Sequence, residues 1–110
     1  MKLNLSKCCL RGADAGKAVG DMLAINTSLK ELDLSGYGPN NSASSDAEFA
    51  KGFAVGLSAN GSLEMLNISN NCMATKQAGN ALANALAVNS VLKELNVANN
   101  FDGRNSEYTQ

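Results

Sequence analysis

The sequence predicts an α/β solenoid, with a parallel β-sheet on its concave face and α-helices on its convex face. A seven-residue segment, Leu-Lys-Glu-Leu-Asp-Leu-Ser at 29–35, recurs in similar form at 63–69, at 92–98 and, truncated, at 3–6. The middle leucines of the copies are 29, 34 and 29 residues apart: Leu3, Leu32, Leu66 and Leu95. A period between about 20 and 50 residues is the signature of stacked repeats. The Ala- and Leu-rich stretches between the copies have helical spacing.

Each copy alternates apolar and polar residues, which predicts a short strand with one buried face. The predicted strands are 1–8, 29–35, 63–71 and 91–100. The buried column holds Leu3, Leu5, Leu32, Leu34, Leu66, Ile68, Leu95 and Val97. The opposite column, which should face solvent or a partner, holds Lys2, Asn4, Ser6, Glu31, Asp33, Ser35, Met65, Asn67, Ser69, Glu94, Asn96 and Ala98.

Apolar residues at helical spacing predict one helix after each of the first three strands, at 13–25, 46–59 and 76–88. Gly16 and Gly20 each lower helix propensity by about 1 kcal/mol relative to alanine. We therefore expect that helix to pack closely on a strand or on the next helix. Phe49 and Phe53 replace smaller residues of the neighbouring helices and predict a bulkier local core.

An asparagine follows each predicted helix, three residues before the first leucine of the next copy: Asn26, Asn60 and Asn89. Asparagine tolerates the left-handed conformation that often ends a helix. These residues are therefore predicted to be C-caps.

Three positions after the last aliphatic residue of each strand come Cys8, Tyr37, Asn71 and Asn100. The segments thus follow the pattern LxxLxLxxN/CxL, and the chain resembles the leucine-rich repeat family over about residues 1–101. Its 29-residue period is similar to that of the intracellular, ribonuclease-inhibitor-like branch. The resemblance implies a right-handed solenoid of about 3.5 repeats and an inward ladder of Asn or Cys side chains. Tyr37 departs from the pattern, so we expect the ladder to be interrupted there.

The 110 residues predict one domain, 1–101, and a polar tail, 102–110. The expected repeats are 1–28, 29–62, 63–91 and a partial one at 92–101, with an insertion loop at 36–44. The chain opens inside a repeat and stops soon after a strand, whereas solenoids need caps. Three interpretations stay open: a fragment of a longer repeat protein, a chain whose ends associate, or a tail that caps the last repeat.

A net charge of −1 gives no electrostatic reason to expect binding to nucleic acid or to an anionic membrane. No apolar run approaches a membrane span, and no signal-peptide pattern opens the chain. Cys9 and Cys72 should lie about 10 Å apart at normal strand spacing, too far for a disulfide. Free thiols and a cytoplasmic location are the expectation.

The sequence contains no constellation typical of an enzyme. No phosphate-binding glycine loop and no GxSxG motif is present, and without histidine there is no ordinary catalytic triad. Cys8 and Cys9 lack a base, and the cysteine spacing matches no zinc motif. We therefore expect no catalysis and no cofactor or metal.

The concave face and the adjacent loop carry the candidate partner-binding residues: Glu31, Asp33, Tyr37, Met65, Asn67, Glu94 and Asn96. Its carboxylates, Glu64 included, are interpreted as a solvated acidic face, as a docking patch for a protein, or as a calcium site, which would need more convergent oxygens. The loop 36–44 is either a tolerated insertion or a contact loop anchored by Tyr37.

The main functional hypothesis is a non-catalytic protein–protein interaction module, or a fragment of one, with a protein partner. The alternative is a structural repeat that self-associates through uncapped terminal repeats, as a homodimer or an end-to-end oligomer. Similarity to the Ran GTPase-activating relatives of this branch adds a third, GTPase regulation, although no matching arginine motif is present.

Overall fold

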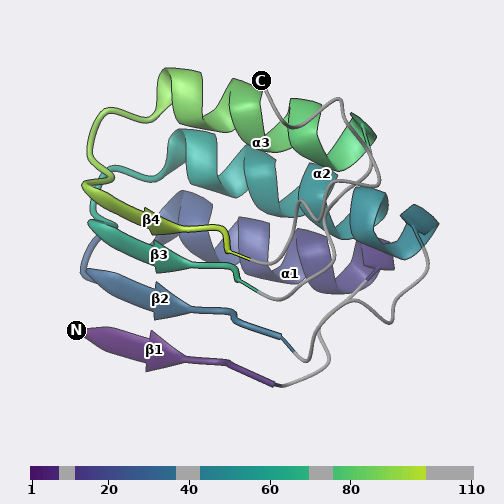
Figure 1. Cartoon of the computed structure of the whole chain (residues 1–110). Helices are drawn as coiled ribbons and strands as arrows, with labels where there is room; N and C mark the ends of the chain where they lie inside the picture. Colours follow the sequence, from purple (N-terminus) through teal and green to yellow (C-terminus); the bar gives the residue numbers. More distant parts are fainter. Residues whose placement is uncertain (8–11, 37–42, 70–75, 99–110) are drawn as a thin grey trace.

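The structure, a computed structural model, describes residues 1–7, 12–36, 43–69 and 76–98, and of residues 43–47 only the backbone. The fold is mixed α/β, as predicted: four parallel strands lie side by side and three helices cover one side of the sheet (Figure 1). The elements in chain order are β1 (Lys2–Asn4), α1 (Gly12–Ile25), β2 (Glu31–Asp33), α2 (Ala43–Ala59), β3 (Met65–Asn67), α3 (Lys76–Val88) and β4 (Glu94–Asn96).

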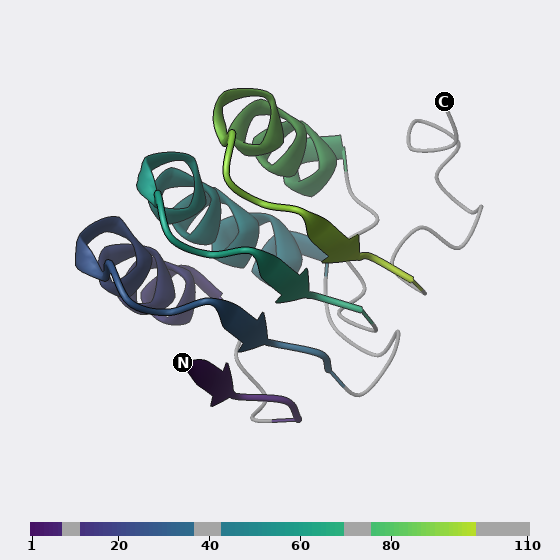
Figure 2. The same cartoon turned by 90° about the vertical axis from the view of Figure 1, so that its left-hand side faces the viewer.

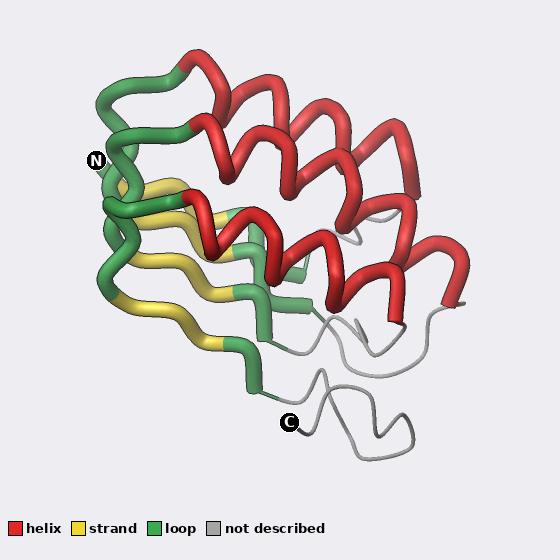
Figure 3. Tube along the Cα trace, turned by 90° about the horizontal axis from the view of Figure 1, so that it is seen from above, coloured by secondary structure: helices red, strands yellow, loops and turns green. Residues whose placement is uncertain are grey.

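The strands follow one another in the sheet in the order of the chain, β1-β2-β3-β4. The middle leucines of the four copies are directly paired across the sheet: Leu3, Leu32, Leu66 and Leu95. The alignment of the repeats on these leucines is therefore confirmed. Seen from the side, the helices form a second row on one face, and no described element covers the other face, which we call the open face (Figures 2 and 3).

Each strand is three residues long, so the longer spans predicted for them, 1–8, 29–35, 63–71 and 91–100, are corrected. The backbone stays paired for a few residues beyond the strands, since Leu34 N–H donates to the carbonyl of Asn67 at 2.7 Å and Gly36 N–H donates to that of Ser69 at 3.0 Å. The helices lie close to prediction. However, α2 begins at Ala43, inside the loop expected at 36–44.

The core lies between the sheet and the helices and is centred on the two middle strands. Leu32, Leu34, Leu66 and Ile68 are between 1% and 4% exposed. At the two ends of the sheet the same column is less covered: Leu3, Leu5 and Val97 are half-buried, and Leu95 is 38% exposed. The helices contribute buried residues at the predicted spacing: Val19, Leu23, Phe49, Phe53, Leu57, Ala78, Leu82 and Ala85.

The bulkier core expected at α2 is confirmed by its two phenylalanines. Phe53 is fully buried and Phe49 is 4% exposed. Their rings stack at a centroid distance of 6.0 Å and an interplanar angle of 16°. Both side chains thus serve as core filling, between the sheet and the row of helices.

Glycines let α1 and α2 approach until their backbones touch. A Cβ on Gly52 would lie 2.7 Å from the carbonyl carbon of Gly16, and a Cβ on Gly56 would meet the backbone of Gly20. No real side chain fits at such distances, so the close packing expected at Gly16 and Gly20 is confirmed, against the next helix. Helix α3 also packs on α2, less closely, and among the described elements α1 and α3 do not touch.

Asparagines end the helices, as predicted, but by a different mechanism. Among the described non-glycine residues only Lys7 has a positive φ, of 57°, so the left-handed caps expected at Asn26, Asn60 and Asn89 are corrected. Each side-chain oxygen instead accepts hydrogen bonds from the backbone N–H groups two and three residues later. For Asn60 these donors are Ser62 and Leu63, at 2.9 and 2.7 Å.

The same side chains also form hydrogen bonds between successive repeats. The Nδ2 group of Asn60 donates to the carbonyls of Leu23 and Asn26 at 2.9 and 3.2 Å. That of Asn89 donates to the carbonyls of Leu57 and Asn60 at 2.9 and 3.2 Å. We call Asn26, Asn60 and Asn89 the asparagine chain. The ladder predicted for Cys8, Tyr37, Asn71 and Asn100 lies outside the described residues.

Candidate functional site

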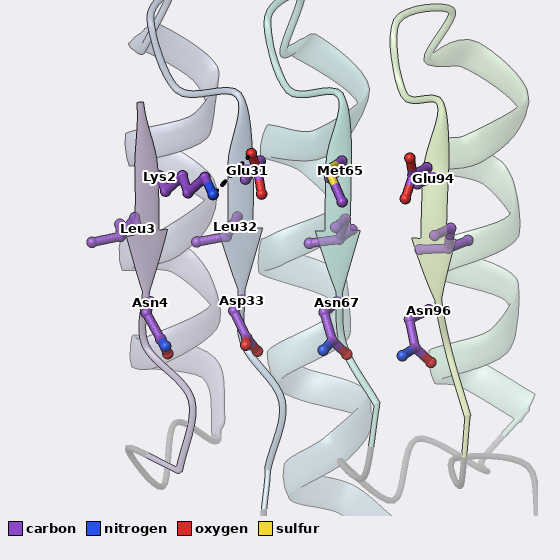
Figure 4. A pocket seen from close by; sticks show the side chains of 12 residues that line it. Lys2, Leu3, Asn4, Glu31, Leu32, Asp33, Met65, Asn67, Glu94 and Asn96 are labelled. Atoms are coloured by element: carbon purple, nitrogen blue, oxygen red, sulfur yellow. Dashed lines mark ion pairs between the residues drawn. The ribbon is translucent and has the colours of Figure 1, made fainter.

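Two rows of side chains cross the open face of the sheet, each with one residue from every strand (Figure 4). The first row holds Lys2, Glu31, Met65 and Glu94, and the second holds Asn4, Asp33, Asn67 and Asn96. Successive side chains of a strand point to opposite faces. The leucine between the two rows therefore points to the helices, and both rows project from the open face.

The two rows border an open hollow with a volume of about 430 Å³. Its lining comes from all four strands, and it includes the six described residues of the predicted partner-binding set: Glu31, Asp33, Met65, Asn67, Glu94 and Asn96. Tyr37, the seventh, lies outside the described residues. Lys2 and Asn4 line the same hollow. The strand alternation already assigns both to this column, because they stand at the repeat positions of Glu31 and Asp33.

The second row is held in place by hydrogen bonds to its own backbone. Each Oδ1 atom accepts the N–H of the residue two positions later, at 2.9 to 3.0 Å: Ser6, Ser35, Ser69 and Ala98. Such turns orient the side chains without help from a ligand. The remaining polar atoms, the Nδ2 groups of the three asparagines and Oδ2 of Asp33, make no hydrogen bond within the described part of the chain. They are available to a partner.

The two rows carry three carboxylates and one lysine. Lys2 and Glu31 form an ion pair of 3.7 Å. At one end of the strands, Glu64 lies 3.8 Å from both Lys30 and Lys93, so that these lysines offset its charge. These exposed pairs contribute little to stability. Across residues 1–7, 12–36, 43–69 and 76–98, Asp33 and Glu94 have no ion-pair partner, which leaves the hollow with two uncompensated carboxylates.

An apolar side chain stands between carboxylates in the first row. Met65 is 37% exposed and is paired in register with Glu31 on one side and with Glu94 on the other. Methionine adapts its shape to irregular partners. Met65 therefore offers an apolar contact between two negative charges, and the second row adds the amide donors of its three asparagines.

The described residues contain neither a cluster of metal ligands nor a membrane-spanning helix. Within those ranges no three histidine, cysteine or acidic side chains gather as metal ligands would, and no described helix is both long and apolar enough to cross a membrane. The three cysteines, Cys8, Cys9 and Cys72, lie outside the described residues, so their predicted free thiols stay a prediction.

Comparison of the chain with protein-family models, with curated proteins and with solved structures found no match. A function for this chain therefore has to be inferred from the geometry of its open face.

Proposed function

We propose that this chain is a non-catalytic protein-interaction module, or part of one, that holds a basic segment of a partner protein against the open face. The observation that carries the proposal is Met65, an exposed apolar side chain flanked by Glu31 and Glu94 in a hollow of about 430 Å³. An arginine or lysine side chain matches this arrangement, because its aliphatic stem packs on the methionine while its charged end meets a carboxylate.

Charge selects the class of partner. The eight side chains of the two rows include one cation, Lys2, and three anions, Glu31, Asp33 and Glu94. An acidic segment would be repelled by Asp33 and Glu94, which have no ion-pair partner within the described ranges. A basic segment would satisfy both.

The second row supplies donors for the backbone of the partner. The Oδ1 atoms of Asn67 and Asn96 are held by backbone N–H groups at 3.0 Å, and their Nδ2 groups have no acceptor within the described ranges. Carbonyl groups of an extended segment lying across the strands can accept from this row. Because the asparagines are already oriented, less side-chain entropy is lost when the partner binds.

We further propose that the fold is a leucine-rich-repeat solenoid of the ribonuclease-inhibitor-like type, with the open face on its concave side, in a cytoplasmic protein. The support is the in-register pairing of the repeated leucines and the asparagine chain that links successive repeats.

Synthetic peptides provide the test. Twelve-residue peptides with basic, neutral and acidic sequences are titrated into the ¹⁵N-labelled chain at low salt. Basic peptides should shift the amide signals of β2, β3 and β4, and the shifts should weaken as salt is added. Glu94→Lys should weaken binding about tenfold or more, and Met65→Ala, which removes the apolar contact without changing the charge, should also weaken it.

Asp21→Lys is the matched control, because it makes the same change of charge as Glu94→Lys at an exposed site on α1. Its binding should weaken far less than that of Glu94→Lys. Equal binding of acidic and basic peptides would contradict the proposed partner chemistry. Shifts confined to the helices would contradict the open face as the binding surface.

A further inference from the structure

One member of the asparagine chain stands next to a glycine. Asn60 is followed by Gly61, whereas the other two members are followed by threonine and serine. An asparagine loses its side-chain amide most readily when glycine follows, because no Cβ hinders the approach of the next backbone nitrogen to Cγ. Asn60 is also the most buried of the three, at 4% exposed, while the other two are half-buried. The most reactive of the three sequences thus stands at the best-covered position.

The fold does not require glycine at position 61. A Cβ added to Gly61 would meet no atom within 4 Å, and the φ of Gly61 lies outside the left-handed region. Thr27 and Ser90 stand at the equivalent positions, and the asparagine before each accepts the same turn hydrogen bonds as Asn60. The consequence of the glycine is therefore chemical, since it makes Asn60 reactive.

We propose that Asn60 is a site of deamidation, which the folded chain prevents and which separation of α2 from α1 permits. The backbone nitrogen of Gly61 attacks Cγ of Asn60, a bond forms between these atoms, and the bond from Cγ to Nδ2 breaks. The proton of the Gly61 nitrogen leaves with Nδ2 as ammonia. Water then opens the five-membered imide at either carbonyl, which gives aspartate or isoaspartate. This inference does not depend on the proposed partner of the open face.

The backbone nitrogen of Gly61 is available for this reaction. Gly61 is exposed, and its N–H makes no hydrogen bond within the described part of the chain. The N–H groups of the next two residues, Ser62 and Leu63, instead bind the side-chain oxygen of Asn60. The attacking group therefore has no hydrogen bond of its own to break, and protection has to come from the side chain of Asn60.

The side chain of Asn60 is held by four hydrogen bonds. Its oxygen accepts two N–H groups of its own turn, and Nδ2 donates to the carbonyls of Leu23 and Asn26 at 2.9 and 3.2 Å. Closing the five-membered ring turns Cγ away from the staggered rotamers that side chains prefer, and loss of ammonia breaks both bonds of Nδ2. Water must also reach a side chain that is 4% exposed. The reaction therefore requires the turn at Asn60 to separate from α1.

Deamidation is not reversed when the chain closes again. Aspartate puts a carboxylate beside the carbonyls of Leu23 and Asn26, and isoaspartate lengthens the backbone of the turn. Both products lack the Nδ2 donor. A buried carbonyl that loses its donor lowers the stability of the folded state. A transient separation of α2 from α1 thus becomes a permanent weakening of the link between the first two repeats.

Peptide mapping by mass spectrometry, which locates deamidation and separates aspartate from isoaspartate, tests the inference. The chain is incubated at mildly alkaline pH in native buffer and in denaturing urea. In urea Asn60 should react before Asn26 and Asn89, and about tenfold or more faster than in native buffer, because the rate follows the population of the open form. Gly61→Ala should slow the reaction of Asn60 in urea about tenfold or more, because the added Cβ hinders the attack. Its melting should stay close to that of the wild type.

Gly56→Ala tests the role of the helix contact, because it disturbs the packing of α2 on Gly20 of α1 and leaves Asn60 and Gly61 unchanged. It should speed the reaction in native buffer about fivefold or more and leave the rate in urea unchanged. Val55→Ala, at an exposed site of the same helix, is the control and should alter neither rate. Equal rates in native buffer and in urea overturn the inference. So does a Gly56→Ala variant that reacts in native buffer as slowly as the wild type.

Discussion

The Nδ2 atom of Asn60 lies 2.9 Å from the carbonyl oxygen of Leu23, a residue of the preceding helix that stands 37 positions earlier in the chain. The side chain is 4% exposed, and its oxygen accepts two backbone N–H groups of its own turn. One residue thus satisfies buried backbone groups in two successive repeats. Its removal should damage both.

Asn60→Asp should lower the free energy of unfolding by about 2–3 kcal/mol, because it removes a buried donor and places a charge beside two carbonyls. Asn26→Asp makes the same chemical change where the described residues offer the Nδ2 group no acceptor. It should therefore cost less than about 1 kcal/mol. Urea unfolding measures both. Equal losses would show that the bond between the repeats contributes nothing.

Gly56→Ala should destabilise the chain by about 1–3 kcal/mol, because the new methyl group would meet the backbone of Gly20 and push α1 from α2. The expected loss opposes helix propensity, which favours alanine by about 1 kcal/mol. Gly61→Ala is the matched control, since no atom lies within 4 Å of its added carbon, and it should stay within about 0.5 kcal/mol of the wild type. A stabilised Gly56→Ala variant would contradict the close helix contact.

Phe53→Ala should lower the free energy of unfolding by about 3–5 kcal/mol, since it empties a fully buried site beside the ring of Phe49. Val55→Ala, on the same helix but 71% exposed, should change it by less than about 0.5 kcal/mol. Chemical denaturation of the two variants gives the comparison. If they lose similar amounts, α2 does not bury the side that carries Phe53.

Asp21 raises the pKa of Lys17 above its ordinary value of 10.5, first through a side-chain hydrogen bond of 2.7 Å and then through attraction between the charges. A pKa raised in the folded state adds stability that is fully present below pH 10.5 and is lost as the pH rises through the folded value. Asp21→Asn should lower the midpoint of the Lys17 titration, followed by NMR of its side chain. An unchanged midpoint would mean that the pair does not persist in solution.

The strand alternation in the sequence predicted which side chains share the open face. Lys2, Glu31, Met65 and Glu94 fall in one column because the side-chain period of a strand is two. The leucine alignment then predicts that they stand side by side, as the register confirms. The hollow could thus be predicted as a set of residues, although its volume and ion pairs could not.

The partners of the asparagine chain could not be predicted from the sequence pattern. Its position after each helix was predictable, because asparagine suits helix ends through either its backbone or its side chain. Which of the two acts depends on acceptors that only the neighbouring repeat provides, such as the carbonyl of Leu23 for Asn60. A local pattern contains no information about a group 37 residues away. Similarly, the glycines on α1 predicted close packing but not their partners, Gly52 and Gly56.

Among the described elements, contacts within one layer run only between neighbours, and the tightest helix contact joins α1 to α2. In such a row, unfolding can start at one end and spread from each element to its neighbour. Opening should therefore begin by fraying at β4, all three of whose residues are exposed, and should spread inward through α3. Native-state hydrogen exchange would then rank the amides by their distance from that end, with the most protected ones on α1 and α2.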